Sequence, residues 1–328
     1  MFSGNGKRVF VQEVATRDGF QIEAAFVPTE TKIALVNELS RTGLCKIEVT
    51  SFTSPKAIPA LRDAEEVMGG IERVPGVTYA ALVPNMRGAE RAMAARVDEL
   101  NLVMSVSETH NLANLRMTRE QSCIQLAEVI RAMRSSGVAI NGSLATCFGC
   151  PMEGPVPEAE VWRLTGALLE AGAAGISLAD TTGMAHPAQV AHMVETFRRR
   201  WPTATLTLHL HNTRGIGLAN VLAALEVGAD RFDASLGGLG GCPYAPGATG
   251  NVCTEDLVHM LEAMGYVTGV DLTRLLGCAR SLASIVGHEV PGQVAKAGPS
   301  TDLHTAPEWL AEVRSRAMGR AEGPRETS

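Results

Sequence analysis

The chain has 328 residues, of which 45% are hydrophobic and 20% charged, so it can bury a complete core. Its formal net charge of -6 argues against general nucleic-acid binding, because a protein that follows a phosphate backbone needs a basic surface. No stretch reaches the roughly 18 apolar residues that a membrane span needs. The seven scattered cysteines are not typical of a secreted disulfide framework. We therefore expect a cytoplasmic protein that binds neither nucleic acid nor membranes.

Short segments rich in β-branched and aliphatic residues alternate with longer segments that have the apolar spacing of helices. The sequence predicts eight strands, at residues 9–15, 46–52, 78–83, 99–106, 139–146, 175–180, 205–212 and 231–236. Helices are predicted between them at residues 31–42, 87–95, 119–136, 158–171, 187–201 and 217–228. Eight such units imply parallel strands that close into a (β/α)8 TIM barrel. The competing fold, an open doubly wound sheet, should carry a glycine-rich phosphate fingerprint in its first turn, where this chain has Thr16-Arg17-Asp18-Gly19.

The domain organisation follows from the end of this alternation. We expect residues 1–300 to form the barrel and residues 301–328 to form a short C-terminal helical extension. Helical spacing is present at residues 272–286 and again near residues 306–317. Residues 319–328 are charged and lack apolar periodicity, so we expect this tail to be disordered.

A glycine-rich stretch at residues 233–256 surrounds one cysteine, Cys242. Glycine allows positive φ and a close approach of the backbone to a ligand, at an entropic cost that a plain connection has no reason to bear. A flexible linker would be polar, whereas this stretch also contains Leu239, Pro243 and Tyr244. The composition favours a mobile loop over a site.

Polar residues at the ends of three predicted strands suggest a metal site. His209 and His211 are two residues apart on a strand, so both imidazoles project to the same side. A closed barrel would bring them near Asp18, after the first strand, and Asn251, after the eighth. Two nitrogen and two oxygen ligands suit Mn2+ or Mg2+, with Zn2+ as an alternative. Arg17 and Asp18 could instead form only a structural salt bridge.

Several motifs together resemble the 3-hydroxy-3-methylglutaryl-CoA (HMG-CoA) lyase family over residues 9–292. They are VQEVATRDGFQ at 11–21, IEVTSFTSPK at 47–56, PN at 84–85, GCPMEG at 149–154, SLADTTG at 177–183 and GGLGGCPY at 237–244. The resemblance implies a metal-dependent barrel that cleaves a 3-hydroxyacyl-CoA by retro-Claisen chemistry. The parent reaction yields acetyl-CoA and acetoacetate and belongs to leucine degradation. Barrels of this kind usually associate, so we also expect a homo-oligomer.

The resemblance assigns roles to individual positions. It implies metal binding by Asp18, His209, His211 and Asn251. Arg17 would stabilise the developing enolate, Asp18 could serve as a base, and Cys242 would act as general acid from the glycine loop. Glu48 and Glu255 would be supporting acid-base or positioning residues. The implied substrate contacts are Arg17, Gln21, Ser51, Asp180 and Arg214.

The chain also departs from the family pattern at the expected barrel mouth. The first motif continues with Phe20 and Ile22, where the family usually has Leu and Asn. After the histidines, Asn212 and Arg214 replace the family's Asp and Tyr, which makes the mouth more positive. The segment at residues 107–116 is altered as well. These changes leave the acyl group open, and citramalyl-CoA or a longer branched 3-hydroxyglutaryl-CoA are the alternatives.

Two further functions remain as alternatives. Condensing enzymes of the isopropylmalate or homocitrate synthase type share the Arg-Asp start and the His-x-His end, but they carry a Gly-Glu-Arg-x-Gly-Asn segment where this chain has Gly241-Cys242-Pro243. The second alternative is a catalytically silent CoA-binding barrel. Retention of Arg17, Asp18 and both histidines argues against it.

Overall fold

The computed structural model describes residues 3–241 and 250–321, with side chains up to residue 318. The chain divides into two compact units, Met1–Lys296 and Ala297–Ser328. Cys242, the central residue of the glycine-rich stretch, lies outside the described residues.

Eight parallel strands close into a barrel in which each strand pairs with its neighbours in the sequence and β8 pairs with β1. The strands are β1 (Phe10–Glu13), β2 (Lys46–Ser51), β3 (Thr78–Val83), β4 (Glu99–Ser105), β5 (Ala139–Ala145), β6 (Gly175–Asp180), β7 (Thr205–Leu210) and β8 (Arg231–Ala234). This arrangement confirms the predicted TIM barrel. The bounds of β3 and β6 coincide with the prediction, and the other strands end one to two residues earlier at their carboxyl ends.

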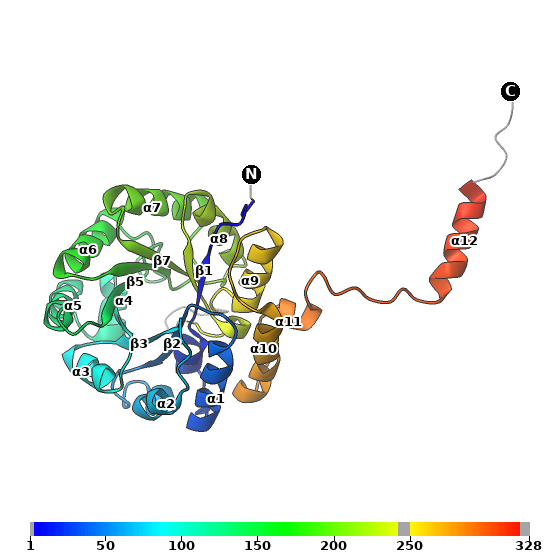
Figure 1. Ribbon diagram of the computed structural model, residues 1–328. Helices are drawn as coiled ribbons and strands as arrows, with labels where there is room; N and C mark the ends of the chain where they lie inside the picture. Colours follow the sequence, from blue (N-terminus) through cyan, green and yellow to red (C-terminus); the bar gives the residue numbers. More distant parts are fainter. Residues whose placement is uncertain (1–2, 242–249, 322–328) are drawn as a thin grey trace. The chain divides into compact units, whose positions relative to one another are not determined.

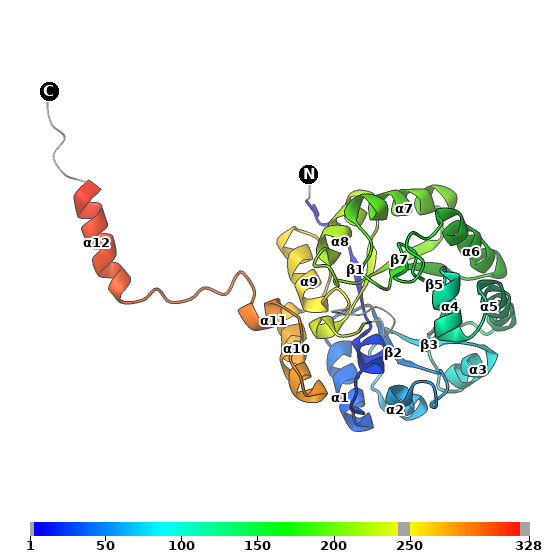
Figure 2. The same ribbon diagram turned by 180° about the vertical axis from the view of Figure 1, so that it is seen from behind.

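Helices surround the strands as an outer ring (Figures 1 and 2). They are α1 (Thr29–Ser40), α2 (Ala64–Gly70), α3 (Met86–Ala94), α4 (Glu108–Leu115), α5 (Arg119–Met133), α6 (Glu158–Ala171), α7 (Pro187–Arg200), α8 (Gly217–Glu226), α9 (Thr254–Ala263) and α10 (Leu272–Val286), with the short α11 (Val294–Ala297) after them. The predicted helices do not include α2, α4, α9 or α11. Helix α4 has only Leu112 and Leu115 as large apolar residues, too few for a helical period. In both views α4 lies inside the ring of outer helices.

The connection after β1 differs from the predicted strand. The strand ends at Glu13, and residues Ala15–Gly19 form one turn of π-helix, η1. The carbonyl of Val14 accepts hydrogen bonds from the N–H groups of Asp18 at 2.7 Å and Gly19 at 3.4 Å, which closes this wide turn. Single π-turns are rare and occur often at functional sites. Here the turn carries Arg17 and Asp18 at the carboxyl end of β1.

The strands face two different environments. Their outward residues, such as Ile47 and Leu208, are fully buried in the apolar core between strands and helices. Polar residues extend into the barrel interior, where Asn141 donates a 3.0 Å hydrogen bond to Asn101, and Asn101 donates one of 2.7 Å to Glu48. Branched apolar residues usually fill this space. The polar interior therefore provides hydrogen-bond partners beneath the barrel mouth.

Two long helices lie in the C-terminal part of the chain, α10 in the first compact unit and α12 in the second. Helix α10 matches the predicted bounds, whereas α12 runs over Trp309–Ala321. Helix α12 includes residues 319–321, for which we expected disorder, and residues 322–328 lie outside the described part. Among the described residues, no helix is long and apolar enough to cross a membrane.

Candidate active site

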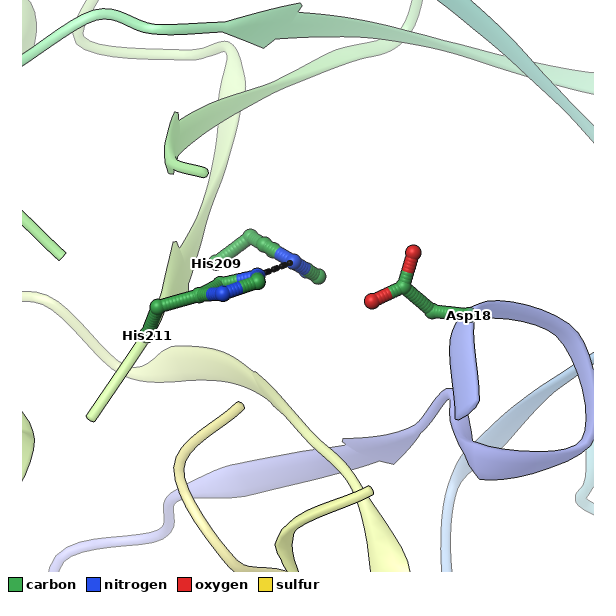
Figure 3. A group of neighbouring side chains, drawn as sticks. All are labelled: Asp18, His209 and His211. Atoms are coloured by element: carbon green, nitrogen blue, oxygen red, sulfur yellow. Dashed lines mark hydrogen bonds between the residues drawn. The ribbon is translucent and has the colours of Figure 1, made fainter. Parts of the chain in front are cut away.

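The carboxyl ends of the strands bring one carboxylate and two imidazoles together. Asp18 from η1, His209 on β7 and His211 immediately after β7 each offer a ligand atom, and these atoms lie within 4.8 Å of one another. Figure 3 shows the two rings and the carboxylate around a common space. The Nε2 atoms of His209 and His211 are 3.2 Å apart. The two-residue spacing on a strand thus places both imidazoles on the side that faces Asp18.

Asn251 reaches the same place through backbone pairing. The C-terminal part of the glycine-rich stretch forms a bridge between His211 and Asn251, and the N–H of Asn212 donates to the carbonyl of Gly250 at 2.9 Å. The side-chain Nδ2 of Asn251 donates to Asp18 Oδ2 at 2.8 Å. These contacts bring residues more than 200 positions apart to one side of the barrel mouth.

The donor set fits a divalent cation. The Nδ1 atom of His211 and the Oδ1 atom of Asn251 are buried and have no hydrogen-bond partner among the described residues. Burial lowers the pKa of His211 to about 3, with the neighbouring His209 as a smaller cause, so its imidazole is neutral at physiological pH. Burial alone would raise the pKa of Asp18, but Arg17 and the two histidines together lower it to about 2. A neutral imidazole and an ionised carboxylate are the forms that bind metals.

Arg17 is held by carboxylates on two sides. Its Nε donates to Glu48 Oε2 at 2.6 Å, and its Nη1 donates to Asp18. Burial opposes the charge of Arg17, yet the attraction of Glu48 and Asp18 outweighs that cost and raises the pKa of the guanidinium. Burial raises the pKa of Glu48, against the opposing effect of Arg17. The guanidinium is therefore a fixed, permanently charged group beside the histidine cluster.

Asp233 is a supporting residue that the sequence analysis missed. It pairs in register with His209 across β7 and β8, and its Oδ2 lies 3.2 Å from His209 Nδ1. Burial opposes protonation of His209, but Asp233 outweighs it and raises the pKa of that imidazole. A carboxylate on Nδ1 fixes the tautomer and ring orientation that leave Nε2 available to a metal. Only the strand register could have revealed this pair, because 24 positions separate the two residues.

A cavity of about 610 Å³ opens onto the cluster. Arg17, Asp18 and His209 line one part of it, and Leu82 and Val103 line another. Gln21, a predicted substrate contact, lines this cavity as well. Helix α4 contributes a wall that includes His110, to which the sequence analysis gave no role. The cavity thus joins a charged end to an apolar surface.

Four predicted site residues remain to be placed, and none of them lines this cavity. The Oγ of Ser51 lies 2.8 Å from Thr53 Oγ1 and accepts a hydrogen bond from the Thr53 N–H. Asp180 accepts a 2.7 Å hydrogen bond from the Met184 N–H, and burial raises its pKa to about 6. Glu255, on α9, accepts a hydrogen bond from the Gly237 N–H at 3.0 Å, and Arg214 donates to the carbonyls of Thr182 and Gly183.

Comparisons with known proteins agree on one family. A family model described as HMGL-like matches residues 8–282. The hydroxymethylglutaryl-CoA lyase YngG of Bacillus subtilis is 48% identical over 287 residues, which cover 88% of this chain and 96% of that protein. The cytoplasmic 3-hydroxy-3-methylglutaryl-CoA lyase of Rattus norvegicus is 40% identical over 90% of this chain and 86% of its own length. A solved HMG-CoA lyase from A. baumannii, in complex with coenzyme A and 3-methylmalate, is 54% identical with a TM-score of 0.88 over 92% of this chain and 98% of that one.

Proposed function

The chain belongs to the HMGL-like family and is a lyase, and we propose that it cleaves HMG-CoA, or a close 3-hydroxyacyl-CoA analogue, by a retro-Claisen reaction. The observation that carries this proposal is the convergence of Asp18, His209 and His211 beside the buried Arg17. The products expected from the family resemblance are acetyl-CoA and acetoacetate.

We propose that Asp18, His209, His211 and Asn251 hold a divalent cation, Mg2+ or Mn2+, with Zn2+ as the alternative. When bound, such an ion acts as a Lewis acid that lowers the pKa of a hydroxyl group on the substrate. Asp233 keeps His209 in the orientation and tautomer that metal binding requires. The Oδ1 of Asn251 has no hydrogen-bond partner among residues 3–241 and 250–318, which supports its assignment, because a buried amide oxygen without a partner is costly.

Arg17 stabilises the charge that the reaction develops. Loss of the C3 hydroxyl proton and cleavage of the C2–C3 bond convert C3 to a ketone and leave the bonding electrons on the thioester as an enolate. A guanidinium held rigidly by Glu48 and Asp18 can donate to the enolate oxygen without reorganising. Asp18 is ionised at physiological pH and is the carboxylate that we propose accepts the hydroxyl proton.

The enolate carbon must then receive one proton. This proton balances the one lost from the C3 hydroxyl, so the overall reaction neither releases nor consumes a proton. We propose that Cys242 donates it from the glycine-rich stretch, although this residue lies outside the described part of the chain. Asn251 and Gly240 belong to the described ends of the same stretch and contact or flank Asp18.

A longer branched acyl group is the second candidate substrate. The cavity that contains Arg17 and His209 also has apolar lining at Leu82, Val103 and Leu115. HMG-CoA carries only a methyl group at C3, whereas an apolar wall stabilises a larger substituent in proportion to the area that it buries. Citramalyl-CoA would place no such group there.

The test is product analysis with a series of thioesters. The purified chain with Mn2+ or Mg2+ should convert HMG-CoA to equal amounts of acetyl-CoA and acetoacetate, measured by liquid chromatography and mass spectrometry. Citramalyl-CoA and a C3-isobutyl analogue would be compared by kcat/KM. Consumption of acetyl-CoA with a 2-oxo acid, and release of free CoA, would instead indicate a condensing enzyme. Binding of CoA without turnover of any thioester would indicate a silent barrel.

Metal dependence and the oligomeric state can be tested separately. Dialysis against a chelator should abolish turnover, and Mn2+ should restore it without a change in circular dichroism. We further propose that the protein acts in the cytoplasm as a homo-oligomer and serves leucine degradation. Sedimentation at micromolar concentration tests the oligomer, since a monomer would contradict it.

A further inference from the structure

One buried carboxylate outside the proposed ligand set joins three separate parts of the site. Glu13, the last residue of β1, has no exposed surface. Its Oε1 accepts hydrogen bonds from the N–H groups of Ala15 at 2.8 Å and Leu236 at 2.9 Å, and its Oε2 accepts one from the hydroxyl of Thr254 at 2.8 Å. Residues 223 and 241 positions away in the sequence therefore meet on a single side chain.

Each of these partners lies at the start of an element near the proposed metal site. Ala15 opens the π-turn, which contains Arg17 and Asp18 and ends at Gly19. Leu236 opens the short η3 helix (Leu236–Gly238) at the start of the glycine-rich stretch. Thr254 opens α9, three residues after Asn251. The partners are all donors, which matches a carboxylate with its oxygen lone pairs available.

We propose that Glu13 is a positioning residue that fixes Asp18 and Asn251 at metal-binding distance from each other. This inference rests on the metal site in the proposed function. The 2.8 Å contact between Asp18 and Asn251 spans 233 positions, and no covalent connection limits their separation. Backbone bridges continue past the strands, between His211 and Asn251 and between Ser235 and Cys253, and the Thr254 N–H donates to the Ser235 carbonyl at 3.0 Å. The hydrogen bonds to one buried carboxylate add to this pairing, because they tie the first residue of the π-turn to the first residue of α9.

The cleanest perturbation removes one hydroxyl and leaves the carboxylate in place. Thr254→Val is nearly isosteric and breaks only the contact to Glu13 Oε2. Thr165→Val is the matched control, because Thr165 is equally buried on α6 and its Oγ1 has no partner among the described residues. Mn2+ binding is measured by electron paramagnetic resonance on the full chain without substrate, and thermal unfolding verifies that both variants fold. We expect Thr254→Val to weaken Mn2+ binding about 5- to 10-fold and Thr165→Val to leave it unchanged.

Two substitutions of Glu13 itself distinguish an effect of the side chain's hydrogen-bonding position from an effect of its charge. Glu13→Gln keeps an oxygen that can accept from both N–H groups and an amide that can donate to the Thr254 hydroxyl, so Mn2+ affinity should stay within about 3-fold of wild type. Glu13→Asp is shorter by one methylene and cannot reach all three partners, so affinity should fall by about 10-fold or more.

The outcomes distinguish this proposal from the metal site itself. Unchanged Mn2+ affinity in folded Thr254→Val or Glu13→Asp would overturn the positioning role and leave the lyase proposal intact. A Gln variant as weak as the Asp variant would also overturn it, because charge would then be the property that matters. A wild-type chain that binds no Mn2+ at all would refute both the metal site and the role of Glu13.

Discussion

Replacing Gly240 by Ala should disrupt the proposed metal site through direct steric contact. Gly240 has φ +107°, and a Cβ there would lie 2.4 Å from Asn251 Nδ2 and 2.9 Å from Asp18 Oδ2. Real Cβ atoms almost never approach a heavy atom closer than 3.0 Å, so Asn251 or the loop backbone must shift by at least 0.6 Å. The substitution therefore places a methyl group against two proposed ligands at once.

Two effects contribute to the expected magnitude. Positive φ costs an alanine about 1 kcal/mol in stability, whatever space surrounds it. The displacement of the ligands adds a functional loss, because errors of about 1 Å in an active site can reduce turnover roughly 100-fold. We expect Mn2+ affinity to fall about 10- to 100-fold and kcat to fall about 100-fold.

Gly228→Ala is the control that isolates these two effects. Gly228 follows α8 with φ +91°, and its added Cβ would meet nothing within 4 Å. Both variants should therefore lose similar stability in urea unfolding, whereas only Gly240→Ala should lose Mn2+ binding by electron paramagnetic resonance and turnover of HMG-CoA. A Gly240→Ala protein that binds Mn2+ and turns over like Gly228→Ala would refute the reasoning.

Three other predictions concern single side chains. Asp233→Asn should weaken Mn2+ binding about 10-fold by loosening His209, whereas the control Asp230→Asn should not, and equal affinities in an equilibrium titration would contradict this. Burial raises the pKa of Glu13 from 4.5 to about 7, so the free energy of unfolding should fall as pH rises through that range. Glu13→Gln should therefore gain roughly 2 to 3 kcal/mol on wild type in urea between pH 5 and pH 8, and a pH-independent difference would argue against it. Cys242→Ala should keep its circular dichroism and Mn2+ binding while kcat drops about 100-fold or more, and near-normal turnover would assign Cys242 a structural role.

Local pattern carried enough information to predict the barrel. A strand buried on both faces reads as a short aliphatic run, and a crossover helix reads as a longer segment with a 3.6-residue period. These signals place β3, β6, α6 and α10 at their observed bounds. Helix α4 escaped because eight residues with two large apolar side chains have no clear period. The predicted first strand continued to residue 15, two residues past its observed end, and the type of turn at residues 15–19 was not predicted.

In the candidate site, too, the sequence pattern predicts some features and the tertiary structure adds the others. The spacing of His209 and His211 by itself determines that both imidazoles share one side of a strand, because side chains alternate along it. Only closure of the barrel brings Asp18 beside them, and only the pairing of residues 250–254 with the ends of β7 and β8 adds Asn251. Asp233 depends on the register between two strands. The contact between Glu13 and Thr254 joins residues 241 positions apart. A local sequence pattern cannot predict such a contact, because only the tertiary structure brings the two residues together.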